Sequence, residues 1–163
     1  MSRISLPPGD APESYRLFSL QPALGKALAG LSEAIYGQTT VDLRVREAVR
    51  MRIAHINQCL LCVGFRFPQQ AAEFAAQNID EAFYAAIPQW RTSALFSERE
   101  KLAIEYAERF AENHLSIDDN FIAGLGRYFS DAEIFALTTV IAGLIANGRI
   151  LQVLQVQQDA CAV

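Results

Sequence analysis

Apolar residues recur along this chain three to four positions apart, which is the spacing of a helix. Leucine or isoleucine stands at positions 24, 28, 31 and 35, where the side chains would share one helical face. Pro22 suits the first turn of this helix and Gly37 its end. No stretch alternates apolar and polar residues as a half-buried strand does. The pattern predicts an all-α fold.

Two serine–glutamate pairs mark the starts of further helices. Ser97-x-x-Glu100 and Ser130-x-x-Glu133 have the form of capping boxes, in which the two side chains satisfy N–H groups at a helix start. The first box predicts a helix that ends near residue 113. The second predicts a helix over 131–147, stopped or kinked by Gly148.

The remaining segments follow from the same spacing and from the prolines and glycines between them. Helices are expected over 22–36, 41–56, 59–77, 79–87 and 117–128, and Pro68 should kink or divide the third of these. The predicted organisation is an extended lead-in over 1–20, one helical domain over 21–158 and a tail over 159–163.

Composition narrows the class of protein. The chain has 163 residues, is 52% apolar and carries a net charge of −4. An acidic chain is a poor partner for nucleic acid, and the high apolar fraction favours a homo-oligomer. The apolar run over 134–146 is too short to span a bilayer, and residues 1–10 lack the apolar core of a signal peptide. We therefore expect no membrane partner and a cytoplasmic location.

Reactive side chains gather in residues 44–66, which also hold five of the twelve arginines. Cys59 and Cys62 have a C-x-x-C spacing, which in an intracellular protein indicates redox chemistry or half of a metal site. Asn57 is expected to cap a helix that begins at residue 58, which would place both thiols in its first turns, where the dipole favours a thiolate. Arg66, four residues after Cys62, would lean back over that thiol and lower its pKa.

Glu47 lies in the same stretch and interrupts an apolar helical stripe that includes Leu43 and Met51. Two interpretations remain open. Burial would raise the pKa of the carboxyl group and make Glu47 a proton acceptor near neutral pH. Alternatively, Glu47 reaches the edge of the helix and pairs with Arg50 or Arg44.

The spacing from Glu47 to Cys59 and Cys62, within RIAHINQCLLC, resembles the alkylhydroperoxidase D-like (AhpD-like) proteins of the carboxymuconolactone decarboxylase superfamily. The LFSERE run from residue 95 is similar to the acidic helix start of that family, and residues 129–149 to its last long helix. The resemblance implies an all-helical fold, homo-oligomers and a cysteine pair that reduces hydroperoxides or exchanges with other disulfides. It also implies that Cys62 attacks, that Cys59 resolves, and that the acid and histidines relay protons.

The sequence departs from this family at two places. Arg66 stands where the family usually has a histidine, and Leu60 and Leu61 occupy positions where some members have one. Arginine stabilises a thiolate but stays protonated, so Arg66 does not shuttle protons. His55 is left as the histidine near the cysteines.

These observations predict a thiol-dependent peroxidase or disulfide reductase that uses an external thiol reductant and needs no cofactor or metal. The expected catalytic residues are Cys62, Cys59, Glu47, His55 and Arg66. Three alternatives stay open: a lyase like carboxymuconolactone decarboxylase, a non-catalytic redox sensor, and a zinc site built from Glu47, His55 and the two cysteines. The third cysteine, Cys161, is interpreted as incidental because chain termini are usually disordered.

Overall fold

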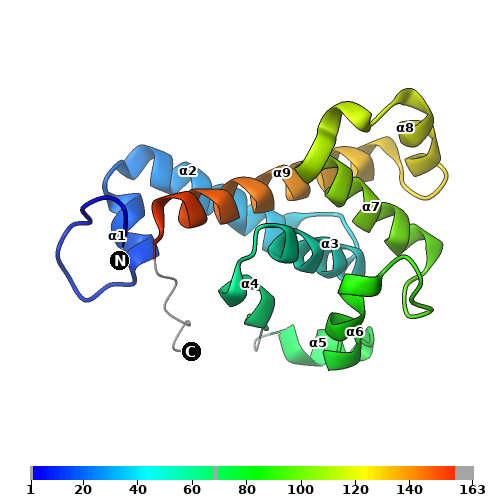
Figure 1. The fold of residues 1–163 in the computed structure, drawn as a ribbon, viewed down its shortest axis with the longest axis horizontal. Coiled ribbons are helices and arrows are strands. Elements are labelled where there is room, and N and C mark those ends of the chain that lie inside the picture. Colours follow the sequence, from blue (N-terminus) through cyan, green and yellow to red (C-terminus); the bar gives the residue numbers. More distant parts are fainter. Residues whose placement is uncertain (1, 68–69, 157–163) are drawn as a thin grey trace.

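The computed structural model describes residues 2–67 and 70–156. Every regular element within these ranges is helical, which confirms the all-α prediction (Figure 1). In chain order the elements are α1 (Glu13–Ser19), α2 (Pro22–Glu33), η1 (Ala34–Gln38), α3 (Leu43–Ile56), α4 (Leu60–Gly64), α5 (Ala71–Ala76), α6 (Glu81–Ala86), η3 (Ile87–Gln89), α7 (Glu98–Asn113), η4 (His114–Ser116), α8 (Asp119–Leu125) and α9 (Asp131–Leu154).

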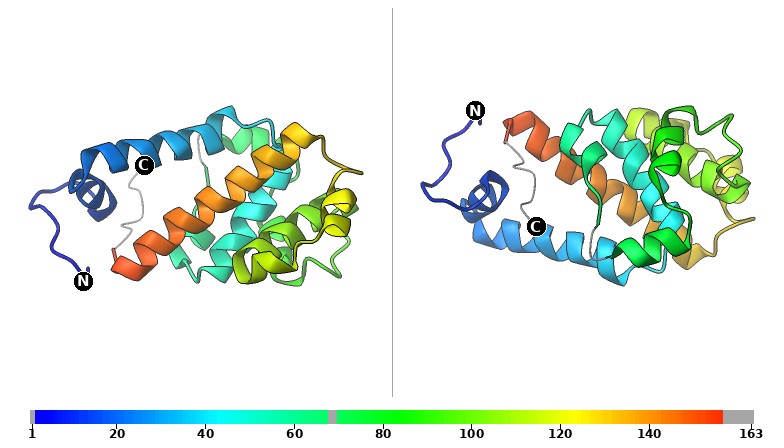
Figure 2. Two further views of the ribbon diagram at one scale, coloured as in Figure 1. Left: turned by 90° about the horizontal axis from the view of Figure 1, so that it is seen from above. Right: turned by 90° about the horizontal axis from the view of Figure 1, so that it is seen from below.

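Helix α3 is the centre of the fold. It packs against α7 and α9, and the short helices α4, α5 and α6 lie on its other side (Figures 1 and 2). One face, with Val45, Val49 and Ile53, belongs to an apolar core shared with α7, α8 and α9. The opposite face, with Ala48 and Met51, belongs to a second core shared with α5, α6 and α7. A helix buried on both faces is held rigidly by its neighbours.

Both predicted capping boxes are confirmed. Ser97 and Ser130 each accept a hydrogen bond from the backbone N–H three residues later, and Glu100 and Glu133 reach back to the serine N–H. They begin α7 and α9, the two longest described helices. Local sequence chemistry therefore sets the start of the two helices that flank α3.

Three predicted boundaries are wrong. The lead-in over 1–20 contains the helix α1, which begins after Pro12 and buries Leu17. The cysteine-bearing segment forms the separate helices α4 and α5, and Pro68 lies outside the described residues. Helix α9 continues through Gly148 to Leu154. Gly148 serves there for close packing, because an added Cβ would lie 2.5 Å from Nδ2 of Asn57.

Helix α9 also changes the view of membrane binding. It has 24 residues, and its most apolar 18-residue stretch has a mean hydropathy of 1.8. By length and composition it could therefore cross a membrane, contrary to the length argument from the sequence. It packs against α2, α3 and α7, and Figure 2 shows it crossing the molecule beside them. Only 28% of its most apolar stretch is buried, and Phe135 is 72% exposed. Phe135, and Val153 at 60% exposure near the other end of the helix, therefore leave apolar surface of α9 uncovered in the single chain.

Candidate active site

The two cysteines stand where α3 turns into α4. Asn57 ends α3 as its C-cap, which corrects the prediction that it starts the next helix. Gln58 then adopts a left-handed conformation with φ of +52°, and the chain reverses into Cys59. The backbone N–H of Cys59 donates to the carbonyl of Ala54, which holds the turn against α3.

Cys59 and Cys62 are joined by a disulfide, with their Cα atoms 5.2 Å apart. The backbone N–H of Cys62 donates to Sγ of Cys59 at 3.2 Å. Cys59 is only 3% exposed, whereas Cys62 is half-buried and lines a cavity. Of the two cysteines, Cys62 is the one among the residues that line the cavity.

This cavity has a volume of about 210 Å³ and lies between α3, α9, the end of α2, η1 and the cysteine segment. Ligand pockets in proteins are usually larger, so its volume suits a small molecule. Apolar side chains predominate in its wall, and a few polar groups converge on it. The lining residues are Ser32, Tyr36, Arg50, Ile53, Ala54, Asn57, Cys62, Phe65, Leu144, Asn147, Gly148 and Leu151.

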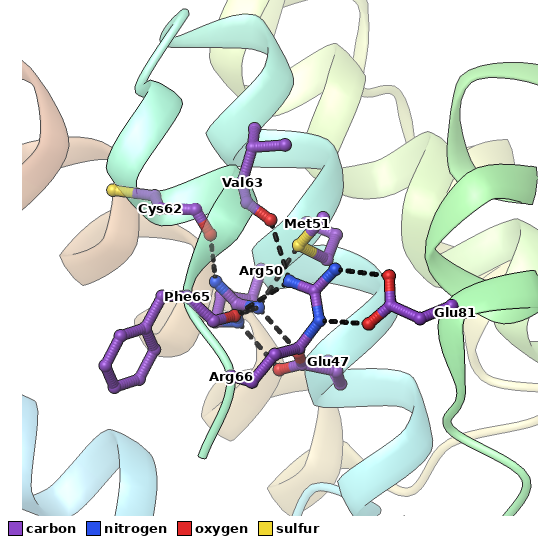
Figure 3. A network of polar contacts seen from close by, with 8 residues as sticks. All are labelled: Glu47, Arg50, Met51, Cys62, Val63, Phe65, Arg66 and Glu81. Carbon is purple, nitrogen blue, oxygen red and sulfur yellow. Dashed lines mark hydrogen bonds and ion pairs between the residues drawn. The ribbon is translucent and has the colours of Figure 1, made fainter. Parts of the chain in front are cut away.

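Glu47 is held in a buried ion pair. Nε of Arg50 donates to Oε2 of Glu47 at 2.7 Å and Nη2 donates to Oε1 at 2.6 Å, while both side chains are at least 95% buried (Figure 3). Burial lowers the pKa of Arg50, but the hydrogen bonds and charge of Glu47 outweigh it and raise that pKa overall. Glu47 thus pairs with Arg50, as one interpretation held, but deep in the protein rather than at the helix edge.

Arg50 connects this pair to the cysteine segment. Its Nη1 donates to the carbonyl of Cys62 at 2.7 Å, and its Nη2 donates to that of Phe65 at 3.2 Å (Figure 3). The last carbonyls of a helix have no partner within the helix, and here Arg50 supplies one for α4. Glu47 is therefore connected to the cysteine segment through Arg50, and Glu47 itself is not among the residues that line the cavity.

Arg66 occupies a different place from the one predicted. Its Nε and Nη2 donate to the two carboxylate oxygens of Glu81 at 2.8 and 3.0 Å, and its guanidinium lies 3.7 Å from the centre of the Tyr84 ring. Figure 3 shows the sulfur of Cys62 pointing away from it. The prediction assumed that one helix carries both residues, but α4 ends at Gly64. The backward lean of a helical side chain therefore does not apply to Arg66.

His55 lies in the last turn of α3 and is outside the cavity lining. Burial and the nearby Arg52 lower the pKa of His55, which keeps its imidazole neutral at pH 7. Glu47, His55 and the two cysteines do not form a metal-binding group within the described residues. The predicted residues therefore converge only partly: the cysteines lie at the cavity, while Glu47, His55 and Arg66 lie behind or beside it.

Sequence reasoning missed two groups in the cavity wall. The sequence analysis considered Arg50 only as a possible partner of Glu47. An acid and an arginine three positions apart on an otherwise apolar helix were nevertheless a usable signal of a buried ion pair. Tyr36 lies on the π-helix η1 and reaches the cavity from a distant part of the chain. No local pattern in the sequence marks Tyr36.

The described residues thus form a helical domain in which a disulfide lies beside a small, mostly apolar cavity. The chain belongs to the carboxymuconolactone decarboxylase family, whose profile matches residues 22–109. This family assignment confirms the resemblance found in the sequence.

Other proteins are similar to this chain in sequence or in fold. The uncharacterized protein YnjA of Escherichia coli K12 is 32% identical over 107 residues, which are 66% of this chain and 56% of YnjA. A solved structure from Agrobacterium tumefaciens, a protein of unknown function named as a candidate antioxidant defence protein AhpD, superposes with a TM-score of 0.72. It has 21% identity and 98% and 99% coverage of the two chains. An uncharacterized peroxidase-related protein from Silicibacter sp. TM1040 superposes with a TM-score of 0.76 at 14% identity, covering 98% and 92%. The fold is therefore AhpD-like.

The buried pair gives a first prediction. Glu47→Ala leaves the Arg50 cation buried without its carboxylate, and we expect the free energy of unfolding to fall by about 3–5 kcal/mol. Urea denaturation measures this change. Glu81→Ala is the matched control, because it also removes the carboxylate partner of an arginine, but that carboxylate is 80% exposed and its loss should matter little. Equal losses in the two variants would contradict the burial argument.

Arg66 gives a second prediction. Because Glu81 and Tyr84 hold its guanidinium, Arg66→Ala should leave the pH profile of Cys62 alkylation unchanged to within about 0.3 pH units, well below the shift of a strong charge partner. The measurement is the rate of thiol alkylation against pH in the reduced protein. A rise of about one unit in the thiol pKa, worth roughly 1.4 kcal/mol, would restore Arg66 as a thiolate partner.

Proposed function

We propose that this protein is a thiol-dependent peroxidase that uses Cys62 and Cys59. The observation that carries the proposal is the unequal setting of the two sulfurs: Cys62 lines the cavity, while Cys59 is buried within disulfide distance behind it. A two-cysteine peroxidase needs one thiol that meets the substrate and one that meets only the first thiol. The AhpD-like fold and the peroxidase-related protein of the same fold support the same activity.

The reaction begins with the reduced pair. The Cys62 thiolate attacks the distal oxygen of a hydroperoxide and the O–O bond breaks. The Cys62 sulfur becomes a sulfenic acid, and the alkoxide that leaves takes a proton to become an alcohol. Cys59 then attacks the Cys62 sulfur, a disulfide forms and water departs. An external thiol reductant returns two electrons by thiol–disulfide exchange and resets the pair. A disulfide substrate would enter through the same exchange.

The lyase alternative is less well supported by the same site. Decarboxylation of a bound acid needs a cation free to hold the substrate carboxylate, and the two arginines that donate to backbone carbonyls of the cysteine segment already pair with acids. Arg50 is bidentate to Glu47 and Arg66 is bidentate to Glu81. A turnover that requires a thiol donor therefore distinguishes the peroxidase both from a lyase, which needs no donor, and from a sensor, which does not turn over.

The cysteines provide the direct test. Cys62→Ser should reduce hydroperoxide consumption, assayed with several thiol donors, to the uncatalysed background. Cys59→Ser, mixed with the hydroperoxide in the absence of any thiol donor, should react once and stop at a sulfenic acid, because no second thiol is present to condense with it. Mass spectrometry after trapping detects that sulfenic acid. Cys161→Ser, at a cysteine outside the described residues, is the matched control and should turn over like the wild type. Sustained turnover by Cys62→Ser would contradict the proposed function.

The proposal includes self-association. Helix α9 has an uncovered apolar face on which Phe135 and Val153 are 72% and 60% exposed, and association of copies would cover it. Sedimentation at micromolar concentration, without detergent, should therefore give a species larger than the 18.0 kDa monomer. The charged variant Phe135→Glu should shift the protein toward monomer, whereas Lys26→Glu is the control. A wild-type monomer throughout the concentration range would contradict self-association.

A further inference from the structure

Tyr36, on η1 before α3, and Cys62, on α4 after it, line the same cavity. The cavity holds only about 210 Å³, so a molecule bound there contacts both walls. We infer that Tyr36 is the catalytic proton donor of the site, giving its phenolic proton to the alkoxide released when Cys62 cleaves a hydroperoxide. This role rests on the proposed peroxidase function and assigns the step for which the sequence offered only a histidine.

The backbone around Tyr36 holds the residue in place. It lies in the π-helical turn η1, a conformation that is often found at functional sites. The carbonyl of Tyr36 accepts a hydrogen bond from Nη1 of the buried Arg46 at 2.8 Å. Its ring packs against Phe67, with ring centres 5.2 Å apart. Tyr36 is thus held in place at both its backbone and its ring.

The electrostatic setting suits a donor. Burial raises the pKa of the phenol, Arg50 opposes that rise, Glu47 adds to it and Arg46 opposes it. The net increase keeps the phenol protonated at neutral pH, so the proton is present when a hydroperoxide arrives. The nearby cation of Arg50 stabilises the phenolate that proton transfer leaves behind. An alkoxide is a stronger base than a phenolate, so the transfer runs downhill even from a weakly acidic phenol.

Protons balance over the cycle. The Cys62 thiol loses one proton to solvent when it becomes the attacking thiolate, and the Tyr36 phenolate recovers one from solvent after the alcohol forms. The thiol proton of Cys59 leaves with the hydroxyl of the sulfenic acid as water. The sum is a hydroperoxide and two thiols converted to an alcohol, water and a disulfide.

The other titratable groups near the cysteines are poorly placed for this step. Glu47 accepts two hydrogen bonds from Arg50, and neither Glu47 nor His55 lines the cavity. Arg66 stays protonated and is bound to Glu81. The phenol of Tyr36 is neutral and carries a transferable proton, and Tyr36 lines the cavity.

The test compares two oxidants whose leaving groups differ in their need for a proton. Cleavage of tert-butyl hydroperoxide releases an alkoxide, whereas cleavage of peracetic acid releases a carboxylate, a weak base that needs no proton to leave. Reduced Tyr36→Phe protein is mixed with each oxidant in a single turnover, and the remaining Cys62 thiol is counted by alkylation. We expect the rate with the hydroperoxide to fall at least ~100-fold and the rate with the peroxy acid to change less than ~3-fold.

Tyr106→Phe is the matched control, because it also removes a phenolic hydroxyl group. That hydroxyl contacts Thr138 in the core shared by α7 and α9, and Tyr106 is not among the residues that line the cavity. Tyr106→Phe should match the wild type with both oxidants. If Tyr36→Phe slows both oxidants equally, the side chain has only a structural role and the inference is wrong. If Tyr36→Phe reacts as fast as an active wild type with the hydroperoxide, the phenol is not the donor, although the peroxidase function stands. A wild type inert to the hydroperoxide would overturn the function and the donor together.

Discussion

The ion pair between Glu47 and Arg50 is the interaction on which the rest of the site depends. Taking two charges out of water costs several kcal/mol per ion, and close bidentate geometry with additional hydrogen bonds is needed to offset it. The pair meets this requirement through two short contacts and through the donors that Arg50 extends to the carbonyls of Cys62 and Phe65. A buried charge with several fixed partners tolerates little displacement. The cysteine helix α4 is therefore positioned relative to α3 by electrostatics as well as by packing.

The arginines around Glu47 hold neighbouring segments together. Arg44 donates to the carbonyls of Gln77, Asn78 and Leu95 and so connects the start of α3 to two loops. Arg52 pairs with Glu108 of α7. Guanidinium groups suit this task because each offers five donors in a rigid plane. The cluster of arginines in the sequence marks the structural centre of the protein, and the influence of these residues on the thiols is indirect.

The sequence predicted those features that are decided locally. Capping boxes and leucine spacing act within one or two turns, so the starts of α7 and α9 and the position of α3 were correct. Predictions that extended a helix past its true end failed, as for Arg66 beyond Gly64. The stop expected at Gly148 failed because close packing against Asn57 uses that glycine within the helix. The position of Tyr36 at the cavity was not predicted, for a related reason. It depends on how α2 and η1 lie against α3 and α9, and no short-range pattern in the sequence encodes that arrangement.

The pairing of fixed charges also limits the chemistry that the cavity can support. Glu47 and Arg66, the charged groups first expected to act on the thiols, are already neutralised by Arg50 and Glu81. Each is bound bidentately by its partner and neither lines the cavity, so neither replaces the histidine that this sequence lacks at position 66. Proton transfer must then come from a group that is neutral at rest and faces the substrate. A buried phenol beside a fixed cation satisfies both conditions, because the cation contributes most after the proton has left. The loss of a titratable imidazole is therefore compatible with peroxide cleavage, provided that the leaving oxygen contacts the wall that carries Tyr36.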